Sequence, residues 1–323
     1  MTGSTALGYV LQFSASLCTS LSYVLQKRAH VGGSLSGSVY CTLPWACGFL
    51  LLCIAAGLNL WSYSMLPQVA LASFGAATLI LNLFLSRLML KEQLAAVDGS
   101  AAVLVTAGTI AALSAVGPSA PSRLSDLVAR LHAPSAVAYI CLSICGGAAA
   151  AVLVERAPRA ALPPSLWLTL VAPALGGAAH SLVAFASKGI AAALFGADVA
   201  AAARQPAAWL FLCANFALLA VQLRYLNVGL SAGSAVRVVP LFQASLITLT
   251  AIAGVCLCGD LQGQPAAQQA QFAGGLLVTV GGVALLALKG QGGEGKEAHQ
   301  LLLGEQGSAT DGPIHAQDSS ARA

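Results

Sequence analysis

Polar side chains stand singly within long apolar runs of this chain, and their types are the ones that could do chemistry. Amides, hydroxyls and one histidine lie inside the runs, while the acidic residues fall at their ends. No nucleophile, base and orienting group stand at a spacing typical of catalysis, so we expect a binding or transport function and no enzyme. The pathway residues predicted on this basis are Asn59, Tyr63, Thr78, Asn82, His180, Asn215, Gln222, Tyr225, Asn227 and Gln243.

Two interpretations are open for the amides and for the histidine. An amide in a membrane helix can hydrogen-bond a neighbouring helix, which is worth about 0.6 to 2 kcal/mol. Alternatively, intramembrane polar groups commonly face a cavity. His180 is either a neutral side chain bonded to a carbonyl or a proton or ion relay. We predict that five amides face a shared interior cavity: Asn59, Asn82, Asn215, Gln222 and Gln243.

Charged residues at the mouths of the apolar runs form a second group: Glu92, Lys188, Arg237 and Asp260. Lys188 ends its run, and snorkelling of its long stem to the membrane surface explains it without a function. Arg237 can also snorkel, although Pro240 nearby removes a helix hydrogen bond and frees a carbonyl. These charges are interpreted as groups that attract or repel a solute at the mouths.

The elements that hold these residues are membrane spans. The 323 residues are 58% apolar and only 8% charged, with a mean hydropathy of +0.81, whereas soluble domains carry about 25% charged residues. The net charge of +4 is spread thinly, which excludes a nucleic-acid-binding surface. The nine cysteines lie mostly in apolar runs, where they behave as small hydrophobes, and they lack the partners of a zinc site.

Nine apolar runs have about the 20 residues that a helix needs to cross a bilayer. They predict an all-α, polytopic membrane helix bundle with about nine transmembrane helices. The runs cover residues 7–26, 42–65, 67–90, 96–116, 134–154, 165–187, 207–226, 232–258 and 271–288. Residues 190–206 are Ala-rich and are expected to lie at the membrane interface.

Basic residues fix the orientation of the spans. Ten Lys and Arg residues fall on one side of the predicted topology and four on the other, so the positive-inside rule makes the C-terminus cytosolic. The four are Arg123, Arg130, Lys188 and Arg204. Residues 1–290 then form the transmembrane transporter domain, and residues 291–323, rich in Gly, Gln, Glu and Ser, form a disordered cytosolic tail.

The chain also matches itself. Val103–Leu113 reads VLVTAGTIAAL and Leu276–Leu286 reads LLVTVGGVALL, 173 residues further on. Each match follows a short acidic turn, at Glu92 and at Asp260. With one connecting helix the second unit is upside down, which is the inverted repeat of many secondary transporters. We predict four plus one plus four helices: repeat one over 7–116, a connecting helix over 134–154 and repeat two over 165–288.

Several patches resemble a known family. The most specific is Gln222-Leu223-Arg224-Tyr225-Leu226-Asn227, followed by Val239-Pro240 and the acidic turn at Asp260. The others are Gly8 to Lys27, Tyr63 to Glu92, and Gly176-Gly177 through Lys188-Gly189. Over about residues 6 to 288 the chain resembles the NIPA-type magnesium transporters, an EamA-like branch of the drug/metabolite transporter superfamily.

The resemblance implies transport of Mg²⁺ as cargo, with no resident cofactor. Mg²⁺ prefers oxygen ligands and keeps several waters, so amides, hydroxyls and carbonyls would carry it partly hydrated. Two alternatives remain: a carrier of a small organic or anionic metabolite, suggested by Arg224 and Arg237, and a membrane adaptor that does not transport. The partners expected are the lipid bilayer, the transported solute and a coat adaptor at the tail, with no nucleic acid.

The tail carries a possible sorting signal. Glu297, Leu301 and Leu302 have the spacing of an acidic dileucine motif, in which the leucine pair fills an apolar pocket of a coat adaptor. A multi-pass protein with this motif is expected in endosomal, vacuolar or plasma membranes.

Overall fold

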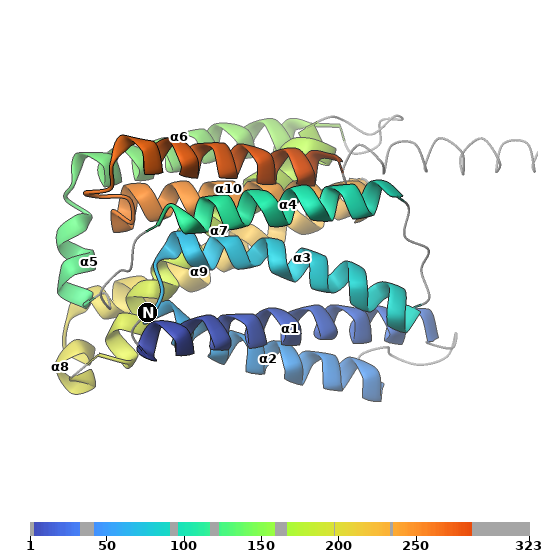
Figure 1. Ribbon diagram of the computed structural model, residues 1–323, viewed down its shortest axis with the longest axis horizontal. Coiled ribbons are helices and arrows are strands. Elements are labelled where there is room, and N and C mark those ends of the chain that lie inside the picture. The colour runs from blue at the N-terminus through green and yellow to red at the C-terminus, as the bar shows by residue number, and fades with distance from the viewer. Residues whose placement is uncertain are drawn as a thin grey trace, which may run out of the picture.

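The computed structural model describes residues 3–32, 42–90, 96–116, 123–158, 167–196, 198–232 and 235–285. Every regular element in these ranges is helical, as predicted. The long helices lie roughly side by side along one axis (Figure 1). The short helices α5 (Leu124–Arg130) and α8 (Val199–Ala203) lie at one end of the bundle, together with the start of the chain (Figure 1). This end is called the α5 end, and the other is called the opposite end.

Two groups of helices are joined by one intervening helix. The first half comprises α1 (Gly3–Gly32), α2 (Leu43–Tyr63), α3 (Gln68–Leu90) and α4 (Ala96–Ser114). The intervening helix is α6 (Pro134–Arg156). The second half comprises the π-helical turn η2 (Trp167–Val171) with α7 (Ala172–Leu194), α9 (Pro206–Ala232), α10 (Ala235–Ala253) with its π-helical end η3 (Gly254–Cys258), and a helix over residues 266–285.

Six helical segments in the described ranges are long and apolar enough to cross a membrane, judged by length and composition. They are Leu43–Tyr63, Gln68–Met89, Pro134–Arg156, Trp167–Leu194, Pro206–Gly229 and Leu241–Cys258. In α4 the apolar segment is shorter, Gly99–Ser114. The helix over 266–285 contains Gln268, Gln269 and Gln271 in its first turns. A polytopic helical bundle fits these observations, but the predicted count of nine spans is not confirmed.

Local sequence explains where several helices begin and end. Proline stands in the first turn of α2 and α6, where its missing N–H has no helical partner to lose. At the other end of a helix, Gly259 has a φ of 70°, a left-handed conformation that suits glycine and ends η3. The helix α7 runs to Leu194, so the first five residues of the Ala-rich stretch 190–206 belong to this long helix, and the location of the stretch at the membrane interface stays a prediction.

The two halves run in opposite directions. A Cβ atom placed at Gly8 near the start of α1 would lie 2.9 Å from the Leu66 side chain. Lys188, near the end of α7, contacts the Leu66 carbonyl. The start of α1 and the end of α7 therefore lie at the same end of the bundle. In each half the first helix packs along the second, α1 against α2 and α7 against α9.

The helices α4 and 266–285 meet at glycines, in what we call the glycine interface. A Cβ at Gly108 would lie 2.5 Å from the Thr279 backbone nitrogen and 2.6 Å from the Gly275 carbonyl. A Cβ at Gly282 would lie 2.8 Å from the Val105 nitrogen and 3.0 Å from the Ala101 carbonyl.

These contacts are related by symmetry. Gly282 lies 174 residues after Gly108, and the same spacing separates Thr279 from Val105 and Gly275 from Ala101. The two matching segments of sequence therefore pack against each other reciprocally. The contacts relate residues 174 apart, whereas the sequence match relates residues 173 apart.

Two apolar clusters connect the halves. One joins α3 and α4 to α10 and the helix over 266–285 near the α5 end, and it includes Val69, Ala112 and Phe272. The other lies further toward the opposite end and includes Leu79, Val105, Ile247 and Val283.

The helix α6 is attached to the second half along its length. The Tyr139 hydroxyl donates to the Leu249 carbonyl at 3.0 Å and lies 2.8 Å from Ser181 Oγ. Ser135 donates to the Cys256 carbonyl at 3.1 Å. At the opposite end, Arg224 of α9 pairs with Glu155 of α6 at 2.7 Å.

Candidate functional site

A buried group of polar atoms lies where the two halves meet at the α5 end. It comprises Leu66 and Gln68 from the α2–α3 connection, and Lys188, Cys258 and Asp260 from the second half; we call it the Lys188 cluster. Lys188 is 2% exposed and Gln68 is fully buried. Lys188 and Leu66 are bonded across 122 residues of sequence, and Cys258 and Gln68 across 190, so only the fold brings them together.

Lys188 is the cation of this cluster. Its Nζ donates to the Leu66 carbonyl at a distance of 3.1 Å. It lies six residues before Leu194, the end of α7, and its side chain is buried. Our interpretation of Lys188 as a snorkelling residue at a helix end was therefore wrong. The reason is that α7 continues through Ala-rich sequence, which places the lysine inside the bundle.

Asp260 is the anion of the cluster. Its Oδ2 accepts the backbone N–H of Val69 at 2.8 Å, close to the N-terminus of α3, where the helix dipole also favours negative charge. Burial raises the pKa of the Asp260 carboxyl, while the Lys188 charge and the N–H groups of Val69 and Gln68 act to lower it. The carboxylate thus depends on partners from both halves.

Gln68 bridges the halves through its side-chain amide. Its Oε1 accepts from the Cys258 thiol at 3.2 Å, and its Nε2 donates weakly to the Ser181 carbonyl at 3.4 Å. Sequence reasoning did not single out Gln68 or Leu66. The available signal was a polar residue directly after Pro67, in the short connection between two apolar runs.

A second set of hydrogen bonds joins the halves at the α5 end. Besides the bonds of the Lys188 cluster, Gln271 donates to Ser114 Oγ at 2.8 Å and to the Ala111 carbonyl at 3.3 Å. Ser114 belongs to the end of α4, and Gln271 belongs to the start of the helix over 266–285. The α5 end is therefore an end at which polar groups attach one half to the other.

Three of the predicted pathway residues bond within the interface of α7 and α9. His180 Nδ1 lies 3.1 Å from Gln222 Oε1. The Asn215 amide donates to Ser187 Oγ at 2.7 Å and to the Val183 carbonyl at 3.1 Å. These bonds correspond to the structural interpretation, an amide that holds a neighbouring helix.

The other predicted pathway residues are dispersed over the bundle. Asn59, Asn82 and Gln243 are half-buried and have no side-chain hydrogen bond to another described residue. Thr78 donates to the Phe74 carbonyl of its own helix at 3.0 Å. Tyr63 is half-buried beside Leu66. Tyr225 is buried in an apolar cluster with Leu168 and Leu175. Asn227 is exposed on α9.

Several predicted site residues lie outside the parts of the chain that the structure describes. Glu92 and the tail residues Glu297, Leu301 and Leu302 fall outside the described ranges, and the side chain of Arg237 is likewise not described. Arg224, one basis for the metabolite-carrier alternative, is exposed and paired with Glu155. Among the described residues no three His, Cys, Asp or Glu side chains gather as a metal site would require.

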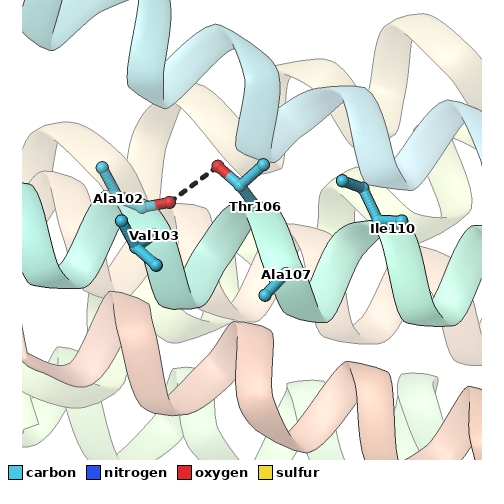
Figure 2. A pocket seen from close by; sticks show the side chains of 5 residues that line it. All are labelled: Ala102, Val103, Thr106, Ala107 and Ile110. Atoms are coloured by element: carbon cyan, nitrogen blue, oxygen red, sulfur yellow. Dashed lines mark hydrogen bonds between the residues drawn. The ribbon is translucent and has the colours of Figure 1, made fainter.

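A shallow depression of about 370 Å³ lies on the outer surface of α4. Figure 2 shows its lining, formed by Ala102, Val103, Thr106, Ala107 and Ile110. The Thr106 hydroxyl is already used, since it donates to the Ala102 carbonyl at 2.7 Å. An apolar lining of this kind suits lipid chains and offers an ion no free ligand.

Comparisons with known proteins place the chain in a family. The family model described as "Magnesium transporter NIPA" matches residues 4–291. Two proteins of Arabidopsis thaliana are similar over most of their length. A "probable magnesium transporter NIPA6" is 24% identical over 288 residues, 86% of each chain, and a "probable magnesium transporter NIPA7" is 22% identical over 295 residues, 88% of this chain and 89% of the relative. No solved structure matches the chain.

Proposed function

The chain belongs to the NIPA family of magnesium transporters, and from that membership we propose that its helical bundle carries partly hydrated Mg²⁺ across a membrane. The observation that carries this proposal is the family match, which extends over residues 4–291 and so over the whole described bundle. The protein is a multi-pass membrane transport protein.

The ligands available favour an ion that keeps part of its water. Mg²⁺ gives up water reluctantly and is usually held by one or two carboxylates together with neutral oxygens. Asp260 is the carboxylate placed between the halves, and the half-buried amides Asn59, Asn82 and Gln243 remain available to line a path. We propose no resident metal or cofactor besides this cargo.

The inverted repeat is part of the proposal. Opposite chain directions of the two halves, matching pairs of packed helices, and the reciprocal contacts of Gly108 and Gly282 all support a pseudo-twofold axis in the membrane plane. We propose four plus one plus four helices, with repeats at 7–116 and 165–288 around the helix predicted at 134–154.

The orientation follows from charge. We propose that the α5 end, which carries Arg123, Arg130, Lys188 and Arg204, faces away from the cytosol, and that the tail over 291–323 is cytosolic. With the dileucine motif in that tail, an endosomal, vacuolar or plasma membrane is the proposed location. Imaging a tagged Leu301→Ala, Leu302→Ala variant tests the location, and an unchanged distribution contradicts it.

The function is tested by flux. Purified protein in proteoliposomes loaded with a Mg²⁺-sensitive dye should admit Mg²⁺ down a gradient, faster than empty liposomes. Excess Ca²⁺ and a panel of organic anions serve as competitors. Flux of an organic anion without flux of Mg²⁺ would contradict the proposal and favour the metabolite carrier instead.

A further inference from the structure

The turn that follows η3 reaches from the second half of the chain onto the first. Asp260 in this turn accepts the backbone N–H of Val69, at the start of α3, at a distance of 2.8 Å from its Oδ2. The two backbones are close here, because a Cβ placed at Gly254 would lie 2.9 Å from the Val69 nitrogen. Asp260 therefore caps a helix of the other half, and its bond joins the halves at the α5 end.

The backbone of this turn is shaped by glycine and by local bonds. Gly259 has a φ of 70° and Gly263 has a φ of 81°, so both are left-handed. The Gln262 N–H donates to the Gly259 carbonyl at 2.9 Å, and the Asp260 N–H donates to the Gly254 carbonyl at 3.1 Å. These bonds close the turn on itself, and its orientation toward α3 then depends on the side chains that pack against it.

Arg130, at the end of α5, lies against this turn. Its Nη1 donates to Gln262 Oε1 at 3.1 Å. A Cβ placed at Gly259 would overlap the same nitrogen, so the guanidinium occupies the space that a larger residue there would need. The helix α5 is itself anchored to the second half, since Leu127 is buried in one apolar cluster with Leu257. Arg130 thus connects an anchored helix to the turn that carries Asp260.

The charge of Arg130 also favours the capping group. Burial raises the pKa of the Asp260 carboxyl, and the charges of Lys188 and Arg130 act to lower it. An ionised carboxylate is the stronger acceptor for an N–H at a helix N-terminus. Arg130 therefore supports both the position of Asp260 and the ionised form that caps α3.

We propose that Arg130 is a positioning residue for the opening of the α5 end during transport: it holds the turn over residues 259–263 in the conformation in which Asp260 caps α3, and the halves separate there more readily once the guanidinium leaves the turn. The linker helix α5 thereby controls one end of the bundle. The inference rests on the proposed transport function in that it treats the α5 end as a mouth of the pathway.

The first experiment compares two glycines of the same turn. Gly259→Ala and Gly263→Ala both place alanine at a left-handed φ, so they should lower the melting temperature by similar amounts. Gly263 has no atom within 4 Å of an added Cβ, whereas the Cβ of an alanine at position 259 would displace the end of the Arg130 side chain. Only Gly259→Ala should therefore open the α5 end.

Cys258 reports this opening. It is 8% exposed, and its thiol donates to Gln68 of the first half at 3.2 Å. In purified protein that keeps Cys258 and lacks the other eight of the nine cysteines, a maleimide should label this thiol slowly. Gly259→Ala and Arg130→Gln should each be labelled about fivefold faster, the factor expected from the loss of one hydrogen bond. Gly263→Ala should be labelled at the wild-type rate, and equal labelling of the two glycine variants would overturn the proposal.

A double variant tests whether the two substitutions act on one contact. If Gly259→Ala acts by displacing the guanidinium, its combination with Arg130→Gln should be labelled no faster than either single variant. Increases that multiply would contradict a shared contact. Arg123→Gln, which removes an exposed arginine at the start of α5, is the control for charge and should be labelled as the wild type is.

Removal of the cap itself should have the larger effect. Asp260→Ala should raise the labelling of Cys258 at least about tenfold, because a charged acceptor is lost. Asp260→Asn keeps an acceptor oxygen, should be labelled at an intermediate rate, and provides the measurement if the alanine variant does not fold. Size-exclusion profiles establish that each variant is folded, and wild-type labelling in a folded Asp260 variant would contradict the role of the cap.

The two proposals fail in different ways. The predicted labelling without Mg²⁺ flux of the wild type in proteoliposomes would contradict the transporter and leave the control of the α5 end by Arg130. Wild-type labelling of Arg130→Gln and Gly259→Ala would contradict the role of Arg130 and leave the transporter. If the wild type carries Mg²⁺, Asp260→Ala should lower the flux several-fold, because the α5 end has to close again in each cycle, and unchanged flux would contradict a role of this contact in transport.

Discussion

The two ends of the bundle connect the halves of the chain by different means. At the α5 end the connection is made by the polar groups of the Lys188 cluster, and by Gln271 of the helix over 266–285, which donates to Ser114 of α4. Toward the opposite end, an apolar cluster of Leu79, Val105, Ile247 and Val283 connects the halves. Because lipid chains can replace apolar neighbours, the opposite end is the one we expect to separate more easily.

The glycine interface is the feature that both ends share, and substitutions there should have the largest effect. A Cβ at Gly275 would lie 2.4 Å from the Ala112 nitrogen, and one at Gly282 would lie 2.8 Å from the Val105 nitrogen. Gly275→Ala and Gly282→Ala should each lower the free energy of unfolding by about 1–3 kcal/mol through overpacking.

The controls for this prediction are adjacent in sequence. Gly274 and Gly281 have no atom within 4 Å of an added Cβ. Gly274→Ala and Gly281→Ala should leave stability unchanged or raise it by up to about 1 kcal/mol, because alanine favours the helix. Thermal unfolding of the four purified variants makes the comparison, and equal effects at neighbouring glycines would contradict the close approach.

A pair of amide substitutions compares the two ends directly. Gln68→Leu removes the acceptor of the Cys258 thiol and should lower stability by about 1 kcal/mol. Gln243→Leu, an amide of α10 with no side-chain hydrogen bond to a described residue, should change it by less than about 0.5 kcal/mol. Unfolding in SDS measures both. Equal losses would mean that the polar attachment is not confined to the α5 end.

Bonds within one half should matter less. His180 and Gln222 join α7 to α9, both in the second half. A double-mutant cycle of His180→Ala and Gln222→Ala should give a coupling of about 0.6 kcal/mol, the average for such pairs in membranes. A coupling above about 2 kcal/mol would contradict this purely structural role.

The smallest effect is expected at the exposed ion pair. Glu155→Gln removes the partner of Arg224 at the opposite end, where water and salt screen the interaction. Its melting temperature should equal that of the wild type at low and high salt. A salt-dependent fall would mean that the opposite end is also attached through charges.

The sequence predicted the positions of the helices better than the contacts between them. Runs of about 20 apolar residues define helices because a bilayer leaves the backbone few other choices. Lys188 bonds to Leu66, 122 residues away in the sequence, and Val69 bonds to Asp260, 191 residues away. A pattern of neighbouring residues cannot predict contacts at such separations.

Local pattern also misled us at two points. The apolar run appeared to end at Lys188, yet α7 continues to Leu194 and the lysine is buried inside the bundle. The match of Val103–Leu113 with Leu276–Leu286 identified the right helices, but the adjacent Gly281 and Gly282 made its register ambiguous by one residue.

The attachment of α6 has a mechanical consequence. Tyr139 and Ser135 bind it to the second half near the α5 end, and the buried Val154 packs it against Leu168 and Tyr225 near the opposite end. Held at both ends, α6 has to travel with α7, α9 and α10 as one rigid body, against which the first half is displaced. Spin labels on α6 and α9 should then keep one distance distribution with and without Mg²⁺, so that α6 can serve as the fixed reference frame from which every displacement of α1 to α3 is measured.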